Sequence, residues 1–263
     1  MDAFNTSVLA GKVAVVAGAS GGINLTIARR FAQQGARLLV ISRSEERIGR
    51  AADSLAGAGV DVIGIAADVR DYQAVDGAMR RARECFGTID IVVSGAAGNF
   101  LAPAGQMSAN AFKTVIDIDL IGSFNVLRAA YPHLTRPGAS LMAVSAPQGK
   151  RPAPLQAHAC AAKAGINMLV QCLAMEWGME GIRVNAISPG PIAGTEGMAR
   201  LAPTQAIEQA FKARLALRDY GTLADVADAA LFLATDNARY ITGTVLDCDG
   251  GCQLGDASPA PPA

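Results

Sequence analysis

The chain has 263 residues, of which 51% are hydrophobic and 17% are charged, and its formal net charge is zero. This length and apolar content fit one large α/β domain, and the neutral balance argues against a nucleic-acid partner. The five cysteines form no CxxC pair and only two histidines are present, so we expect no metal site. The sequence contains neither a recognisable signal peptide nor an apolar run of membrane-spanning length. We therefore expect a cytoplasmic protein with no membrane partner.

The first predicted element is a buried strand that leads through a glycine-rich turn into a helix. Val13 to Val16 is apolar without polar alternation, which is typical of a strand buried on both faces. The bare amides of Gly18 to Gly22 could approach a pyrophosphate, and Ile23, Ile27 and Phe31 then recur at helical spacing. Strand, glycine turn and helix together indicate a dinucleotide-binding βαβ unit.

One residue departs from the usual fingerprint of such a turn, because Asn24 stands where its last glycine is expected. Asparagine tolerates left-handed geometry and can cap a helix, so we expect the turn to survive. Its effect on cofactor affinity is open.

The end of the second predicted strand, Leu38 to Ile41, indicates which nicotinamide cofactor is bound. NAD-binding folds place an acid near this point to hold the ribose hydroxyls, whereas this chain has Ser42 and Arg43. A guanidinium can bind a 2′-phosphate, so NADP(H) is favoured. The alternative is an ordinary exposed loop arginine.

Strands and helices alternate along the rest of the chain. The predicted helices are Glu45–Leu55, one that begins near Asp71 and ends at Cys85, Ser108–Tyr131, Leu155–Met179 and Ala224–Ala234, and the predicted strands are Val60–Ala66, Ile89–Ser94, Leu141–Val144, Ile182–Ile187 and Thr244–Leu246. This alternation predicts one α/β domain, doubly wound around a mostly parallel sheet of about seven strands. Residues 193–219 are predicted to form a small helical lid, and residues 256–263 a disordered tail.

Two acidic segments allow more than one interpretation. Asp68 follows the third strand and could accept from an adenine amino group or cap the helix that begins near Asp71. Asp117 and Asp119 are separated by one isoleucine, so they cannot share a helix face and at most one points inward.

The chain resembles the short-chain dehydrogenase/reductase superfamily over nearly its whole length. The landmarks are Gly18-x-x-x-Gly22, Asp68-Val69, Gly95-Ala-Ala-Gly98, Lys163, Arg183-Val-Asn185, Pro189-Gly190 and Asp249-Gly250-Gly251. The resemblance implies a Rossmann-fold reductase domain over residues 1–255. Ordinary members carry a tyrosine four residues before the active-site lysine and a serine on the preceding strand. Here these positions are Ala159 and Ala146, so an alkoxide would lack its usual acid and the chain should reduce ketones poorly.

A narrower resemblance extends from about Gly11 to Gly251. It rests on Asn99-Phe-Leu-Ala-Pro-Ala-Gly105, Phe112-Lys-Thr-Val-Ile-Asp-Ile-Asp119, Gln156-Ala-His158 and Gly190-Pro-Ile-Ala-Gly-Thr-Glu-Gly197. These segments are similar to the peroxisomal type of 2,4-dienoyl-CoA reductase, which also lacks the tyrosine. The resemblance implies NADPH-dependent reduction of a 2,4-dienoyl-CoA to a 3-enoyl-CoA in unsaturated fatty-acid breakdown, by a homotetramer. The C-terminal residues spell no peroxisomal address, which favours a bacterial-like cytoplasmic relative.

The same resemblance assigns roles to individual residues. Asp119 and Lys163 would be catalytic and would hold a water between them, and Asn99 would donate to the thioester oxygen. The cofactor contacts expected from the glycine turn and the resemblance are Gly18, Ser20, Gly21, Gly22, Ile23, Arg43, Asp68, Val69, Ala96, Lys163, Pro189, Gly190, Ile192 and Thr195. The substrate contacts are Arg43, Arg70, Asn99, Phe100, Ser108, Asn110 and Arg200.

Several alternatives stay open. Asp119, Lys163 and Arg200 could be solvated surface groups, and His158 could be an acid or a structural residue. The chain could instead reduce an enoyl- or 3-oxoacyl-CoA, or bind NADPH without catalysis, since the tyrosine and the serine are both absent.

Overall fold

A computed structural model describes residues 7–57 and 59–258. Seven parallel strands form one sheet in the order β3-β2-β1-β4-β5-β6-β7. The strands are β1 Val13–Ala17, β2 Arg37–Ser42, β3 Val62–Ala66, β4 Ile91–Ser94, β5 Ser140–Val144, β6 Arg183–Pro189 and β7 Val245–Cys248. The prediction of a doubly wound sheet of about seven strands is therefore confirmed, and the order reverses between β1 and β4, where such sheets bind their ligands.

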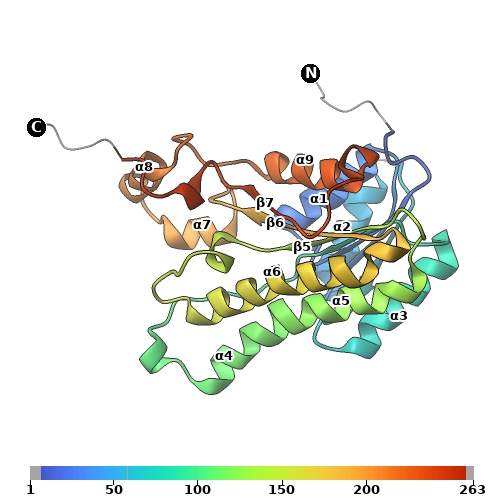
Figure 1. The fold of residues 1–263 in the computed structure, drawn as a ribbon, viewed down its shortest axis with the longest axis horizontal. Coiled ribbons are helices and arrows are strands. Elements are labelled where there is room, and N and C mark those ends of the chain that lie inside the picture. The colour runs from blue at the N-terminus through green and yellow to red at the C-terminus, as the bar shows by residue number, and fades with distance from the viewer. Residues whose placement is uncertain (1–6, 58, 259–263) are drawn as a thin grey trace, which may run out of the picture.

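Helices cover both faces of the sheet. The α-helices are α1 Gly22–Gln33, α2 Glu45–Ala56, α3 Tyr72–Phe86, α4 Ala109–Ile116, α5 Gly122–Ala130, α6 Ala157–Trp177, α7 Glu196–Leu201, α8 Gln205–Arg214 and α9 Leu223–Ala234. Short 3-10 turns are η1 Ala104–Gln106, η3 Tyr131–His133, η4 Pro147–Gly149, η5 Gly178–Glu180, η6 Asp236–Ala238 and η7 Cys252–Leu254. Figure 1 shows α3, α5 and α6 on one side of the sheet and α1 and α9 on the other.

Strand β1 lies between the two hydrophobic cores. Val13, Val15 and Ala17 contribute to the core under α3, α5 and α6, while Ala14 and Val16 contribute to the core under α1, α2 and α9. Successive side chains of a strand point to opposite faces, so an uninterrupted apolar strand contributes side chains to both cores. This confirms the prediction of a strand buried on both faces.

The single helix predicted over residues 108–131 is divided by a π-helical turn, η2, at Asp117–Ile121. The Ser123 hydroxyl donates to the Asp119 carbonyl oxygen at 2.6 Å within this turn. Gly122 packs closely against Val69, which lies in the loop before α3. A Cβ on Gly122 would lie 2.6 Å from Val69 Cγ2. The turn buries Asp119 to 1% exposure and leaves Asp117 outside, paired with Lys113. The prediction that at most one carboxylate points inward is confirmed.

Several strand boundaries differ from the predicted ones because pairing with the neighbouring strand decides where a strand starts and ends. β3 starts at Val62 rather than Val60, and β4 starts at Ile91, since Ile89 forms only an isolated bridge to Leu134. β6 continues past Ile187 to Pro189, where its last residues pair with β7.

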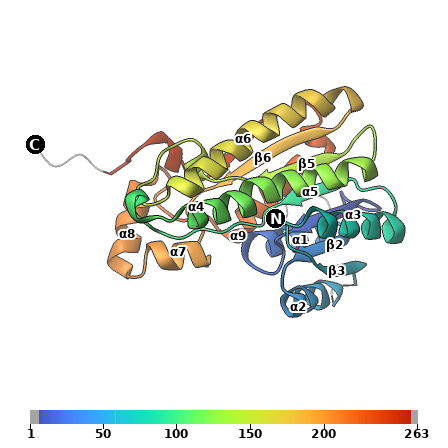
Figure 2. The same cartoon turned by 90° about the horizontal axis from the view of Figure 1, so that it is seen from below.

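Two short helices, α7 and α8, lie within residues 193–219 (Figures 1 and 2). Thr195 and Thr204 are their N-cap residues, and each hydroxyl accepts from a backbone amide of the first turn. Of the tail predicted over residues 256–263, Asp256 pairs with Arg214 at 2.9 Å, and residues 259–263 lie outside the described residues. Within the described ranges, no helix has the length and apolar character needed to cross a membrane.

Candidate active site

Two adjoining depressions open at the carboxyl edge of the sheet. We call the larger one the cofactor cleft. It is lined by Gly18, Ser20 to Asn24, Ser42 to Ser44, Arg47, Ala67 to Val69, Gly95 to Gly98, Ile118, Val144 to Ala146, Lys163, Pro189, Gly190, Ile192 and Gly194 to Gly197. All the residues predicted to contact the cofactor line this cleft. Distant segments of the chain are thus brought together by the parallel sheet, whose strand ends share one edge.

The glycine turn fits a ligand that must approach the backbone. Gly18 has a φ of +82°, and a Cβ there would lie 2.7 Å from the Ala96 amide nitrogen. Only glycine satisfies both demands without strain. A Cβ on Gly22 would meet nothing within 4 Å, so the turn leaves open space where α1 begins. The residues present therefore fit a pyrophosphate at a helix N-terminus.

Asn24 does not cap the helix, contrary to one expectation, because it lies inside α1, whose N-cap is Gly21. Its side-chain Nδ2 instead donates to the Gly95 carbonyl oxygen at 2.7 Å and reaches the Gly18 carbonyl oxygen at 3.4 Å. A Cβ on Gly95 would lie 2.1 Å from Asn24 Oδ1. Asn24 therefore occupies the space that a side chain at position 95 would need, and it ties the glycine turn to the end of β4.

We expect Gly95→Ala to destabilise the fold by about 1–3 kcal/mol, because the new methyl group displaces the Asn24 amide and leaves buried polar groups unpaired. Adding Asn24→Gly should recover part of this loss, so that the double variant is more stable than the sum of the single losses implies. Urea unfolding measures all three. Gly77→Ala is the control, since its Cβ would meet nothing within 4 Å on α3. Strictly additive losses at positions 24 and 95 would contradict this packing.

Two arginines lie near the expected position of a 2′-phosphate. Arg43 lines the cleft as predicted, and Arg47, which the sequence analysis missed, lines it too. A Cβ on Gly21 would lie 3.9 Å from Arg47 Nη2, which places this guanidinium beside the glycine turn. Arg47 follows Arg43 by four residues on the first turn of α2, a spacing that could have indicated it.

Asp68 and Arg70 bind each other at the end of β3. The Asp68 carboxylate accepts from the Arg70 guanidinium at 2.6 Å and from the Arg70 amide at 3.0 Å, and these bonds hold the pKa of Asp68 below its usual value. Asp71 caps α3, so the capping role considered for Asp68 is wrong. Asp68 lines the cofactor cleft, whereas Arg70 lines neither depression.

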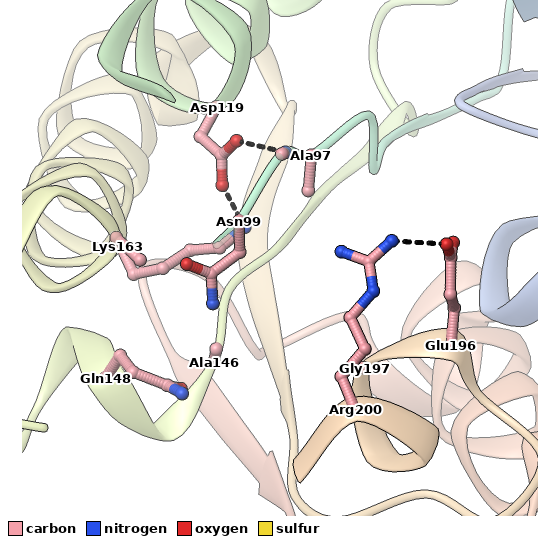
Figure 3. Close-up of a pocket in the computed structure, with 11 residues that line it drawn as sticks. Ala97, Asn99, Asp119, Ala146, Gln148, Lys163, Glu196, Gly197 and Arg200 are labelled. Atoms are coloured by element: carbon pink, nitrogen blue, oxygen red, sulfur yellow. Dashed lines mark hydrogen bonds and ion pairs between the residues drawn. The ribbon is translucent and has the colours of Figure 1, made fainter. Parts of the chain in front are cut away.

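The smaller depression, which we call the substrate pocket, adjoins the cofactor cleft (Figure 3). It is lined by Ala97, Gly98, Asn99, Asp119, Ala146, Gln148, Ala159, Lys163, Glu196, Gly197 and Arg200. Arg200 pairs with Glu196 at its rim. The sequence analysis did not predict that Gln148, Glu196 and Gly197 line this pocket. Their positions depend on how the loop after β5 and helix α7 pack in the folded chain.

An almost fully buried ion pair forms one wall of the pocket. Asp119 Oδ2 lies 3.0 Å from Lys163 Nζ, and Asp119 Oδ1 accepts from the Gly98 amide at 2.8 Å (Figure 3). Lys163 Nζ also donates to the Val144 carbonyl oxygen at 3.0 Å. Asp119 is 1% exposed and Lys163 is 8% exposed, so neither is the solvated surface group that the sequence left open.

The hydroxyl groups of ordinary relatives are absent from this pocket. Ala146 and Ala159 line it at the serine and tyrosine positions. Ser145 turns away and donates to Asn167 Oδ1 at 2.6 Å. The four tyrosines of the chain line neither depression: Tyr131 donates to Glu180, Tyr220 to the Glu208 carbonyl oxygen, Tyr240 is fully exposed and Tyr72 packs on the core.

The predicted substrate contacts are only partly brought together. Arg43, Asn99 and Arg200 line the two depressions, but Phe100, Ser108 and Asn110 do not. Ser108 is used as the N-cap of α4, where it accepts from the Ala111 amide at 3.1 Å.

His158, whose role the sequence left open, is a buried residue behind the pocket wall. The Phe100 ring packs against His158 with 4.3 Å between ring centroids. His158 is fully buried, and burial lowers its pKa below the ordinary value. These features favour a structural role over an acid.

Comparison with known proteins agrees with this geometry. A parallel sheet of this order with a glycine turn after β1 is typical of folds that bind a dinucleotide at the carboxyl edge of the sheet. The family model described as enoyl-(acyl carrier protein) reductase, one of the short-chain dehydrogenase/reductases, matches residues 18–253. The chain belongs to the short-chain dehydrogenase/reductase family.

Its relatives narrow the comparison. The peroxisomal 2,4-dienoyl-CoA reductase [(3E)-enoyl-CoA-producing] of Pongo abelii is 43% identical over 253 residues, which cover 95% of this chain and 87% of the relative. The enzyme of the same name from Saccharomyces cerevisiae is 41% identical, over 92% of this chain and 84% of the relative. Carveol dehydrogenase from Mycobacterium avium in complex with NAD matches with a TM-score of 0.89 and 29% identity, over 95% of this chain and 100% of that one.

The relatives also correct one expectation. The 2,4-dienoyl-CoA reductases among them are named peroxisomal enzymes, so the predicted cytoplasmic location is wrong. That prediction was a default, drawn from targeting signals that were not recognised, and no residue of the folded domain specified it.

Proposed function

We propose that this protein reduces 2,4-dienoyl-CoA thioesters to 3-enoyl-CoA with NADPH. The observation that carries the proposal is the buried pair of Asp119 and Lys163 in a pocket where Ala146 and Ala159 replace the usual hydroxyls. The names of the relatives support the same reaction.

The chemistry suits a pocket without a tyrosine. When bound, the nicotinamide supplies a hydride to C5 of the dienoyl group, and the electron pair moves through the conjugated bonds to the thioester oxygen. This oxygen needs hydrogen-bond donors rather than a proton, and the Asn99 carboxamide at the pocket wall supplies one. A water bound to the directly paired Asp119 and Lys163 then delivers a proton to C2, and the double bond remains between C3 and C4.

The cofactor assignment is supported by Arg43 and Arg47, since both guanidinium groups line the cleft next to Ser42 and Ser44. Ser42 stands at the end of β2 where a carboxylate would repel a 2′-phosphate, and two guanidinium groups lie beside it. Lys163 lines both depressions, which supports a second role for its amine in binding the nicotinamide ribose.

We expect Arg43→Ala to weaken NADPH binding by about one to two decades and NADH binding little, because a charge-assisted hydrogen bond contributes about 1.5–3 kcal/mol. Titration of protein fluorescence with each cofactor measures both affinities. Arg50→Ala is the matched control: Arg50 lies on α2, the helix that follows Arg43, pairs with Glu46 at 2.8 Å and should change neither affinity. An equal loss for NADH and NADPH at Arg43→Ala would contradict the assignment.

The proposal extends to coenzyme A binding and to a lid. Arg200 lies on α7, lines the pocket and pairs with Glu196; it would bind a coenzyme A phosphate once this contact opens. Helices α7 and α8 would then close over the thioester. An assay of NADPH oxidation against dienoyl-, enoyl- and 3-oxoacyl-CoA tests the substrate class; turnover of only the last two, or of none, would contradict the proposal.

We also expect a homotetramer. α4, η2 and α5 follow one another end to end, and α6 lies beside them (Figures 1 and 2). Their outer surface exposes large apolar side chains: Phe112, Ile121, Phe124, Met168 and Met175. Exposed apolar surface of this extent is typical of an interface. Light scattering at micromolar concentration should give the mass of four chains, and a monomer mass would refute the expectation.

A further inference from the structure

Gln156 lies directly behind the substrate pocket and contacts two of its polar walls. Its Oε1 accepts from Asn99 Nδ2 at 2.8 Å and from Gln148 Nε2 at 3.2 Å. Asn99 and Gln148 line the pocket, whereas Gln156 is only 7% exposed and does not. One buried oxygen therefore holds two pocket carboxamides that come from different loops, after β4 and after β5.

The backbone around Gln156 is shaped for this contact. Gln156 is the N-cap residue of α6, yet its side chain makes no capping bond to the helix. The preceding Leu155 has a φ of +65°, a left-handed conformation that is unfavourable for a residue with a side chain. Its carbonyl oxygen accepts from the Ala102 amide at 2.9 Å, which is a second link between the same loops. Such strain is retained where the surrounding structure requires it, often at functional sites.

The shared acceptor decides which end of each carboxamide faces which way. An amide nitrogen has two hydrogens, so one can bind Gln156 while the other points toward the pocket. Figure 3 shows the Asn99 and Gln148 carboxamides approaching the same part of the pocket, near Ala146. Free rotation of either group would present its oxygen there instead, and an oxygen would repel the negative charge that develops on the substrate.

We propose that Gln156 is a positioning residue for the reduction: it fixes the carboxamides of Asn99 and Gln148 with their N–H groups directed at the thioester oxygen. The inference rests on the proposed function and adds Gln148 as a second donor to this oxygen. Gln156 itself does not touch the substrate.

Gln156→Leu removes the acceptor at similar volume. We expect kcat on a 2,4-dienoyl-CoA to fall about 10- to 100-fold, somewhat less than loss of an oxyanion donor itself, because the donors remain but are no longer oriented. KM and NADPH affinity should change less than about threefold, since the lost interaction strengthens only as charge develops. Gln156→Glu keeps an acceptor oxygen and should lose less than Gln156→Leu.

A double-variant cycle separates positioning from general packing. In an Asn99→Ala background, Gln156→Leu should cost several-fold less in kcat than it does in the wild type, because one of the groups that it orients is gone. The matched control is Gln34→Leu, a buried glutamine far from the pocket whose Oε1 accepts from the Val8 amide; it should leave kcat unchanged. The proposal would be overturned if Gln156→Leu lowered kcat by the same factor with and without Asn99→Ala. It would also be overturned if Gln34→Leu lowered kcat as much as Gln156→Leu does.

An infrared measurement on a bound, unreactive thioester tests the positioning role of Gln156 without turnover. Hexanoyl-CoA labelled with carbon-13 at the thioester carbonyl, bound together with NADP⁺, should show a lowered stretching frequency in the wild type that returns toward the free value in Gln156→Leu. If the carbonyl stretching frequency is the same in the wild type and in Gln156→Leu, the inference is overturned. A kcat that does not fall in Gln156→Leu would also overturn it. Should Gln156→Leu fail to bind NADPH, Gln156→Met, which also lacks the acceptor oxygen, gives the same comparison. Failure of the proposed function appears separately, as a wild type that reduces no dienoyl-CoA.

Discussion

Asp119→Asn should lower kcat on a 2,4-dienoyl-CoA by about 10²–10⁴, which is the usual contribution of a positioned acid–base group. The asparagine can still accept from the Gly98 amide, as Asp119 Oδ1 does at 2.8 Å, so the local backbone should stay in place. It cannot carry the negative charge that holds Lys163 and the water. Because the carboxylate lies in the substrate pocket rather than among the cofactor phosphates, NADPH affinity should change little.

The control for this variant lies on the same π-helical turn. Asp117→Asn alters a carboxylate two residues earlier that faces outward and pairs with Lys113, and kcat should stay within about twofold of the wild type. Phenylalanine at Tyr72, Tyr131, Tyr220 or Tyr240 should also leave a folded variant active. If one tyrosine variant loses turnover while Asp119→Asn keeps it, a displaced tyrosine is the acid and the water relay is wrong.

Lys163→Ala should reduce both turnover and NADPH binding, unlike Asp119→Asn. Its amine contacts Asp119 Oδ2 and the Val144 carbonyl oxygen and lines both depressions. We expect kcat to fall by at least about 10² and NADPH affinity by about one decade or more, since a hydrogen bond from a charged group contributes about 1.5–3 kcal/mol. Steady-state kinetics and cofactor titration measure the two effects.

Removal of this lysine also leaves Asp119 buried without its partner. Breaking a buried pair costs about 3–5 kcal/mol of stability, so each variant needs an unfolding measurement beside its kinetics. Lys113→Ala removes the exposed lysine of the neighbouring pair and should affect neither kcat nor the cofactor. Unchanged NADPH affinity in a folded Lys163→Ala protein would contradict the dual role.

The sheet could be predicted from the sequence because each strand carries its own local signal. Val13 to Val16 is apolar throughout, and Gly18 to Gly22 follows directly, so strand, turn and helix could be placed without knowledge of their neighbours. Parallel strands then bring their ends to one edge, which is why residues as distant as Gly18 and Thr195 line the same cleft.

Features that depend on contacts between distant residues could not be predicted. The π-helical turn depends on Gly122 packing against Val69, and Asn24 is explained only by the absence of a side chain at Gly95, 71 positions away. The same limitation applies to Gln156, whose partner Asn99 is 57 positions away. Arg70, which the resemblance assigned to the substrate, pairs with its neighbour Asp68, and its contact with the substrate stays a prediction.

The central claim is that a dienoyl thioester is reduced at C5 and protonated at C2 without a tyrosine. Its most direct test is the product formed from 2,4-hexadienoyl-CoA and NADPH that carries deuterium at the transferable C4 position of the nicotinamide. We expect the wild type to form 3-hexenoyl-CoA with deuterium at C5 and a solvent proton at C2, and Asp119→Asn to form almost none. A 2-enoyl product, or deuterium at C3, would contradict it.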